Sequence, residues 1–398
     1  MSLAYCNIGG VISPDIANFS KLQTLSLLGN NLHGGIPSSF DSLSSLATLY
    51  LSDNNLEGNI PSSFHNLSSL VILDLGNNRL TGQIPPSLCQ LPALVELWLY
   101  HNQLSGTIPD SISKLASLQR LPLSSNRLTG NVSLQLFDNL TRLQELGLSG
   151  NRLHINISPS WVPQFSNLKF IGLGFCNIKG SLPREVFHGF LVVDLHANRF
   201  YDTLPDLDFD GDMLVLLDNE FNGSIPATIG TLSYLSLSGN NLTGEIPSST
   251  CTDSSGLMIL DLSKNKLTGM IPSNIGRRSN LLVLQLAQNV LEGKIPEELG
   301  NLQTVYTLNL EGNRLGGTPW KRPFATGKRV SAVETRNDSS PSRFWQLRLQ
   351  IVGLSKYLSW EIIDLKVLDQ VKEDENIVQP EYETLKDRSI QAPYWLEP

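Results

Sequence analysis

Aromatic rings, histidines and arginines that stand between leucines are the side chains best suited to chemistry in this 398-residue sequence. In the segment ELWLYHN, Leu97 and Leu99 alternate with Trp98 and Tyr100, and His101 follows. Successive residues of a strand point to opposite faces, so this alternation predicts buried leucines and exposed rings. Exposed aromatic and arginine side chains anchor many protein interfaces, which indicates non-covalent binding.

Other leucine-bracketed segments of the chain show the same alternation. The candidate ligand-binding residues that it selects are Tyr50, Trp98, Tyr100, His101, Arg120, Glu145, Phe170, Phe175 and His196. The alternative is that some of these rings are ordinary surface residues, because isolated exposed apolar side chains are common.

The predicted binding face and the chain as a whole are acidic. The formal net charge is −8, and residues 320–398 carry 12 basic and 12 acidic side chains, so the excess lies before them. Nucleic-acid binding depends on lysine and arginine, and the charge argues against it and against other polyanions. A neutral or basic ligand fits this face better.

Catalytic and metal-binding motifs are missing from the sequence. It contains no HExxH, GxSxG, P-loop or CxxC motif, and no kinase HRD or DFG element. Asp206 to Asp212 starts like a calcium loop, but Leu217 occupies the twelfth position, where an acidic ligand is required. We therefore predict a protein that is not an enzyme and that has no metal site and no cofactor.

A repeat of about 24 residues positions the candidate residues. Residues 46–70 read LxxLxLxxNxLxGxIPxxFxNLxxL, and the pattern recurs in fourteen units between residue 1 and about 319. The repeated asparagine is replaced by cysteine at Cys6 and Cys176. This period is the signature of a leucine-rich-repeat solenoid, an α/β repeat fold. Stacked turns share one core, which predicts a curved arch of about 14 repeats with short parallel strands on its concave face.

Individual repeat positions have a physical role. The Asn54 side chain is expected to satisfy backbone groups of the turn, and cysteine can replace it as a small, weak donor. Gly58 permits a backbone angle that other residues avoid, and Pro61 suits a turn on the outer wall.

The GxIP element, for example at Ile60-Pro61 and Ile84-Pro85, resembles the plant-specific class of leucine-rich repeats. That class includes the ectodomains of receptor-like kinases and receptor-like proteins, and polygalacturonase inhibitors. The stretch from Trp161 to Pro183 looks most like receptor-like proteins. The resemblance implies recognition of a peptide or protein ligand on the concave face, in defence or development, with a co-receptor as a further partner. A secreted polygalacturonase-inhibitor-like protein and an intracellular scaffold are the alternatives.

The resemblance also implies an extracellular location, at the plasma membrane or in the apoplast. Eight N-x-S/T sequons agree with it: Asn18, Asn66, Asn131, Asn139, Asn156, Asn222, Asn241 and Asn337. The first residues already fit the repeat, so we expect that a signal peptide is missing from this chain. No apolar run reaches 18 residues, so we expect no transmembrane segment in this chain, and we expect a monomer. The four cysteines lie in different turns, which predicts no disulfide among them.

The repeat pattern defines the domain boundaries. We predict a solenoid at 1–319, a linker at 320–342, a helical capping segment at 343–372 and a disordered tail at 373–398. The capping helix is inferred from apolar residues at helical spacing after Phe344.

Overall fold

The structure is a computed structural model. It describes residues 1–157, 167–182, 189–206, 209, 211–227, 232–251, 256–277, 280–302, 304–305, 307–316, 331–334 and 345–349. Residues 1–349 form one compact unit, and the repeat core lies within it.

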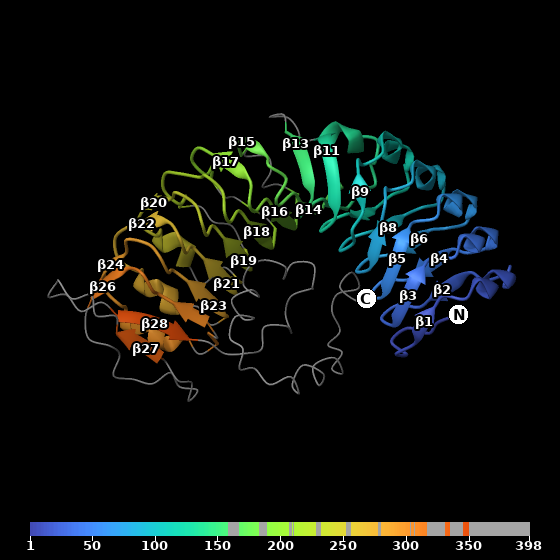
Figure 1. The fold of residues 1–398 in the computed structure, drawn as a ribbon. Coiled ribbons are helices and arrows are strands. Elements are labelled where there is room, and N and C mark those ends of the chain that lie inside the picture. Colours follow the sequence, from blue (N-terminus) through green and yellow to red (C-terminus); the bar gives the residue numbers. More distant parts are fainter. Residues whose placement is uncertain are drawn as a thin grey trace. The chain divides into compact units, whose positions relative to one another are not determined.

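One three-residue strand from each repeat after the first joins a long sheet on the inner side of this unit (Figure 1). The alternation of leucine with outward-facing residues produces these strands. Their order follows the chain: β2 Thr24–Ser26, β4 Thr48–Tyr50, β6 Ile72–Asp74, β8 Glu96–Trp98, β10 Arg120–Pro122, β12 Glu145–Gly147, β14 Phe170–Gly172, β16 Val192–Asp194, β18 Met213–Val215, β19 Tyr234–Ser236, β21 Ile259–Asp261, β23 Val283–Gln285 and β25 Thr307–Asn309. Neighbouring strands are parallel and in register, which confirms the predicted leucine-rich-repeat solenoid.

A second row of short parallel strands follows the asparagine turn of most repeats. Its members are β1 Gly9–Val11, β3 Asn31–Gly35, β5 Asn55–Asn59, β7 Arg79–Thr81, β9 Ser105–Gly106, β11 Arg127–Ser133, β13 Arg152–Asn156, β15 Lys179–Ser181, β17 Arg199–Tyr201, β20 Thr243–Gly244, β22 Lys266–Leu267, β24 Glu292–Lys294 and β26 Arg314–Gly316. The glycine of the GxIP element lies within or just after these strands. Gly58, in β5, has φ +76°, a conformation that glycine adopts without strain.

Helices on the outer wall are short 3-10 helices. They are η1 Pro14–Asn18, η2 Ser38–Ser42, η3 Ser62–Asn66, η4 Pro86–Gln90, η5 Asp110–Lys114, η6 Leu134–Phe137, η8 Ser248–Cys251, η9 Ser273–Arg277 and η10 Glu297–Asn301. The GxIP proline precedes several of them as the N-cap: Pro61, for example, has φ −61° and ψ 124° before η3. Its fixed φ starts the turn, and one apolar residue such as Phe64 then points into the core.

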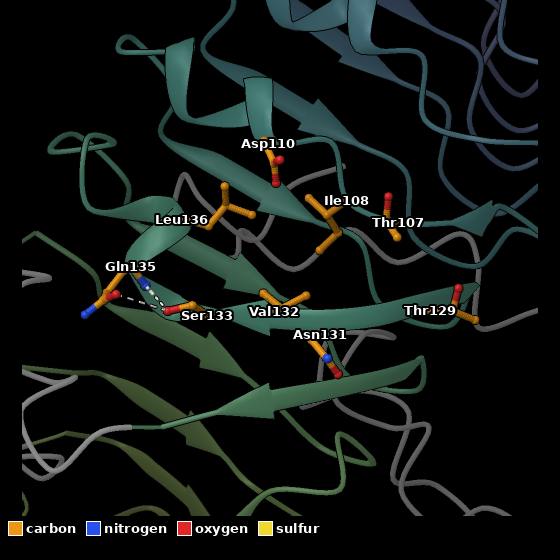
Figure 2. A pocket seen from close by; sticks show the side chains of 9 residues that line it. All are labelled: Thr107, Ile108, Asp110, Thr129, Asn131, Val132, Ser133, Gln135 and Leu136. Atoms are coloured by element: carbon orange, nitrogen blue, oxygen red, sulfur yellow. Dashed lines mark hydrogen bonds between the residues drawn. The ribbon is translucent and has the colours of Figure 1, made fainter.

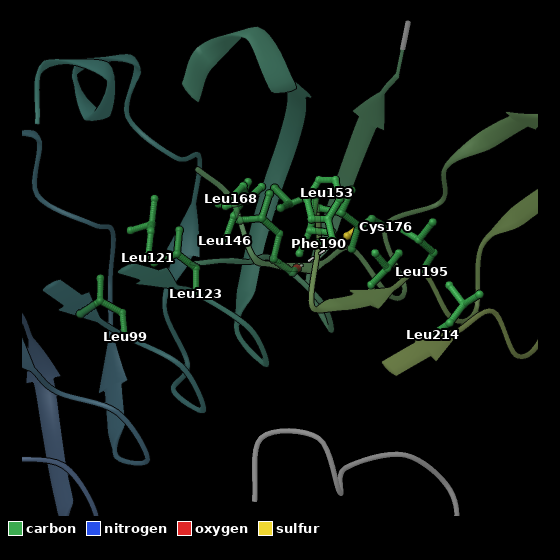
Figure 3. Close-up of a cluster of buried hydrophobic side chains, with 14 of the residues drawn as sticks. Leu99, Leu121, Leu123, Leu146, Leu153, Leu168, Cys176, Phe190, Leu195 and Leu214 are labelled. Atoms are coloured by element: carbon green, nitrogen blue, oxygen red, sulfur yellow. Dashed lines mark hydrogen bonds between the residues drawn. The ribbon is translucent and has the colours of Figure 1, made fainter. Parts of the chain in front are cut away.

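The core is a continuous column of leucines from neighbouring repeats, of which Figure 3 shows Leu99, Leu121, Leu123 and Leu146. All four are fully buried. Because each repeat covers the leucines of the next, the repeats depend on one another for stability.

The repeated asparagine connects each turn to its neighbours. Asn102 Oδ1 accepts from the Leu80 amide at 2.9 Å, and its Nδ2 donates to the carbonyls of Leu75, Leu99 and Tyr100 at 2.9, 3.3 and 3.1 Å. The cysteine variant keeps part of this function, since Cys176 Sγ donates to two carbonyls at 3.4 and 3.6 Å. The prediction that cysteine fits this position is confirmed.

The C-terminal prediction is wrong where the structure describes that region. Trp345–Leu349 is a strand, β28, and pairs antiparallel with β25 and with β27 Ser331–Glu334, which falls in the predicted linker. The segment WQLRL also alternates apolar and polar residues, and the free edge of β25 offers unpaired backbone groups to such a strand. The rest of 317–398 lies outside the described residues. Cys6, Cys89 and Cys176 are free thiols.

Candidate ligand-binding face

The outward-pointing side chains of the long sheet form the inner face. On β8, Leu97 is fully buried while Glu96 and Trp98 are half-buried on the opposite side, as the alternation predicts. Parallel registration places Trp98 opposite Asp74, and Glu96 opposite Arg120. Residues about 24 apart in the sequence therefore become neighbours on this face.

Arg120 connects the charged and aromatic groups. Its guanidinium lies 3.3 Å from Glu96 Oε1 and 3.9 Å from Glu145 Oε2, and its Cζ lies 5.8 Å from the centre of the Trp98 ring. The Trp98 indole donates to Glu96 Oε2 at 2.9 Å. These contacts hold Trp98 in one orientation, and two carboxylates surround one cation, so the cluster is net acidic.

Tyr100 and His101 continue this cluster beyond the end of β8. The rings of Trp98 and Tyr100 meet edge to face at 6.1 Å, and those of Tyr100 and His101 at 5.7 Å. Tyr100 lies over Gly76 of the preceding repeat, where a Cβ atom would come within 2.3 Å of the ring. Glycine at this position is therefore what lets the tyrosine lie flat on the inner face.

A second cluster surrounds the end of β16. His196 Nδ1 lies 2.6 Å from Asp194 Oδ1, and the His196 ring meets Phe175 edge to face at 4.9 Å. Phe175 is 53% exposed, but His196 is only 8% exposed, because its ring fills the space above Gly174. His196 alternates with the buried Leu195 and so lies on the inner face, but it is nearly covered there, packed against Phe175, Asp194 and the Gly174 backbone.

The remaining candidates lie between and beside the two clusters. Phe170 is half-buried on β14 and lies opposite Glu145, which joins the clusters along the sheet. Tyr50 lies opposite Asp74, which separates it from Trp98. Gly147 and Gly172 lie opposite each other, so the floor between the clusters is low and carries only the small side chains of Ser124 and Ser149 beside these glycines. Reading the repeats in alignment would have revealed this low floor, which the linear alternation missed.

Asp74 is a functional candidate that the list of binding residues omitted. Its carboxylate accepts from the Ser52 hydroxyl and from the Gly76 amide at 3.0 Å, between Tyr50 and Trp98. Burial raises the pKa of Asp74 from 3.8 to about 6, and the nearby Asp53 and Glu96 charges add to this effect. Ionisation of Asp74 therefore costs more free energy in the folded chain than in the unfolded chain.

This raised pKa predicts a pH-dependent stability. Between about pH 4 and 6 the folded chain keeps a proton that the unfolded chain has released, so the free energy of unfolding falls as pH rises through this range. The loss is at most about 3 kcal/mol, and Asp74→Asn should abolish it. Urea unfolding at pH 4.5 and pH 7 measures both proteins, with Asp110→Asn at an exposed carboxylate as control. A pH profile of Asp74→Asn equal to that of wild type would contradict the assignment.

Other features of the described residues lie away from the inner face. A cavity of about 390 Å³ opens on the outer wall between η5 and η6, and Figure 2 shows the side chains that line it. It forms where the sequence GNVS replaces GxIP, so that η6 begins after Ser133 instead of after a proline. Over the described ranges, no three His, Cys, Asp or Glu side chains are grouped to hold a metal ion. No helix within those ranges has the length and apolarity needed to cross a membrane.

Comparison with known proteins agrees with this geometry. Family models match residues 1–172 ("Leucine-rich repeat region"), 231–252 ("Leucine Rich Repeat") and 255–315 ("Leucine rich repeat"). A search of curated protein sequences gave no match. Fold and repeat pattern together define a leucine-rich-repeat solenoid with an exposed inner face.

Solved structures similar to this chain include the ectodomains of plant receptors. The chain is 32% identical to PEPR1 in its complex with AtPEP1, with a TM-score of 0.68, over 77% of this chain and 44% of that one. It is equally identical to the Arabidopsis receptor kinase HAESA, solved with the peptide hormone IDA and the co-receptor SERK1, with a TM-score of 0.65, over 77% of this chain and 52% of that one. The chain is thus a leucine-rich-repeat protein and resembles the ectodomains of plant receptors. It spans about half the length of these receptors.

Proposed function

We propose that this chain is the extracellular recognition domain of a plant receptor-like protein or receptor-like kinase, and that it binds a peptide or protein on its inner face. The observation that carries the proposal is the cluster of Trp98, Arg120, Glu96 and Glu145. Its ring and charges are fixed in place before any ligand arrives, which lowers the entropic cost of binding. The likeness to peptide-hormone receptors supports the same reading.

The ligand that suits this face is an extended segment with a basic side chain. Glu96 and Glu145 flank the single cation Arg120, and Asp74 and Asp194 lie further along the sheet. The low floor at Gly147 and Gly172 leaves room for a backbone to cross the strands. Recognition of this kind is non-covalent. We therefore also propose that the chain has no enzymatic activity of its own.

Selection from a displayed library of random peptides tests the function. Wild-type protein should enrich peptides that contain lysine or arginine, and counter-selection against Trp98→Ala should remove most of them. Enrichment that is identical with both proteins would show that binding lies away from the inner face. No enrichment with either protein, in repeated selections, would contradict a peptide-binding role.

The extracellular part of the proposal predicts glycosylation. Six sequon asparagines, at positions 18, 66, 131, 139, 222 and 241, have exposed side chains; Asn156 ends β13, and Asn337 lies outside the described residues. Secretion from plant cells behind an added signal peptide should yield glycans at Asn66, Asn139 and Asn241, detected by mass spectrometry. Ser68→Ala removes the Asn66 sequon and should delete that glycan alone. Three unmodified sites would remove most support for an extracellular location.

A further inference from the structure

A row of basic side chains lies on the second row of strands, away from the inner face. We call it the basic strip, and it consists of Arg127, Arg152, His154, Lys179 and Arg199. All five are exposed, because the residues that alternate with them, such as Leu153 and Phe200, fill the core. Strands β11, β13, β15 and β17, which carry the strip, contain no aspartate or glutamate.

The strip is contiguous along the stack of repeats. β11 pairs with β13, and β15 pairs with β17. The Asn177 side chain lies 3.2 Å from His154 Nδ1 and joins β13 to the repeat that carries β15. Paired parallel strands lie about 4.8 Å apart. Arg152 lies opposite Thr129, two residues beyond Arg127, and Lys179 lies directly opposite Arg199.

The placement of these cations is unfavourable for the isolated chain. Lys179 and Arg199 are direct cross-strand partners, and like charges placed opposite each other destabilise a sheet. Within the described residues, none of the five makes an ion pair with a carboxylate. The chain carries a net charge of −8, so a concentrated positive row is not a consequence of its composition. An anionic partner would relieve this repulsion.

The neighbours of the strip indicate what kind of anion fits. Outward positions beside the cations hold hydroxyl and amide groups, at Ser105, Thr129, Asn131 and Ser181. Among the described residues, exposed carboxylates adjoin the strip only at its Tyr201 end: Asp202 follows Tyr201, and Glu220 of the next repeat donates its amide to the Phe200 carbonyl. The one exposed ring is Tyr201, at 38% exposure, at one end of the strip. Protein interfaces are built around an aromatic or apolar centre that this surface lacks, and a membrane-bound surface needs apolar side chains as well. Hydroxyl groups, cations on successive repeats and a terminal ring match a chain of sugar acids.

We propose that the basic strip binds a linear acidic polysaccharide, with its carboxylates on the arginines and lysine and one sugar ring stacked on Tyr201. This site is separate from the inner face, and its occupancy does not depend on the peptide ligand. It also revises the conclusion, drawn from net charge alone, that polyanions are disfavoured. The inner face remains acidic and the second row of strands carries the opposite charge.

Binding of oligogalacturonate by the full chain tests the proposal. Arg152→Glu/Arg199→Glu should weaken binding at least about 10-fold in calorimetry, because charge-assisted hydrogen bonds are lost and repulsive charges replace them. Lys266→Glu/Arg314→Glu is the matched control: it makes the same change in net charge, at exposed sites in later repeats. It should bind like wild type, and thermal midpoints of all three proteins should agree.

Three results would overturn the proposal. Equal weakening by both double variants would show a response to net charge and not a site. Stronger binding of poly-glutamate than of oligogalacturonate would assign the strip to an acidic protein partner instead. Absence of binding to oligogalacturonate at low ionic strength, where electrostatic attraction is strongest, would also contradict the proposal.

Discussion

Asn102→Ala is expected to destabilise the solenoid by about 3 to 5 kcal/mol, because it leaves several buried backbone groups without partners. The side chain serves the amide of Leu80 and three carbonyls in two successive repeats, and it is only 8% exposed. Alanine can replace none of these hydrogen bonds. The neighbouring turn cannot move in to fill the small cavity that alanine leaves. The effect should appear as a lower urea midpoint and as a matching loss in the free energy of unfolding.

Two further variants separate hydrogen bonding from packing at this position. Asn102→Cys should cost about 1 kcal/mol less than alanine, because Cys176 shows that a thiol can donate to the carbonyls of the turn. Gln103→Ala, at the next residue, should change stability by less than about 1 kcal/mol. Equal costs for alanine and cysteine, or a cost below about 1 kcal/mol for alanine, would contradict the role assigned to the asparagine.

Trp98→Ala is expected to weaken binding of a selected peptide by about 2 kcal/mol or more, which is roughly 30-fold in affinity. The variant removes the ring that faces the ligand, and it also releases Arg120 and Glu96 from the contacts that orient them. The fold should survive, since Leu97 and Leu99 hold this turn in the core. Calorimetry measures the affinity and thermal unfolding checks the fold.

Matched variants identify which property of Trp98 matters. Trp98→Phe keeps an aromatic face above Arg120 but loses the indole N–H, so it should lose less affinity than alanine. Ser273→Ala, exposed in η9 on the outer wall, should bind like wild type. If Trp98→Ala and Ser273→Ala bound equally well, the ligand would have to contact another surface.

The sequence was sufficient to predict the repeat, the inner strands and the main aromatic cluster. Leucine spacing and alternation act within a single repeat, so Trp98 and Tyr100 could be assigned to the exposed face from ELWLYHN alone. The burial of His196 could not be predicted in this way. It depends on Gly174 in the preceding repeat, and only an alignment of equivalent positions brings these two residues together.

Other errors have the same origin. The basic strip could not be predicted from the net charge of the chain. Acidic residues on the inner face outnumber the basic residues that the second row of strands brings together. At the C-terminal end, Trp345 to Leu349 fits both helical spacing and strand alternation. The open edge of β25, which is a property of the folded stack, favours the strand there.

A crystal structure of the chain with a selected peptide tests the central claim most directly. The peptide is expected to cross β8, β10 and β12 on the inner face, with one side chain against the Trp98 ring and a basic group within ion-pair distance of Glu96 or Glu145. A peptide bound to the outer wall or to the second row of strands, with the inner face empty, would contradict the account.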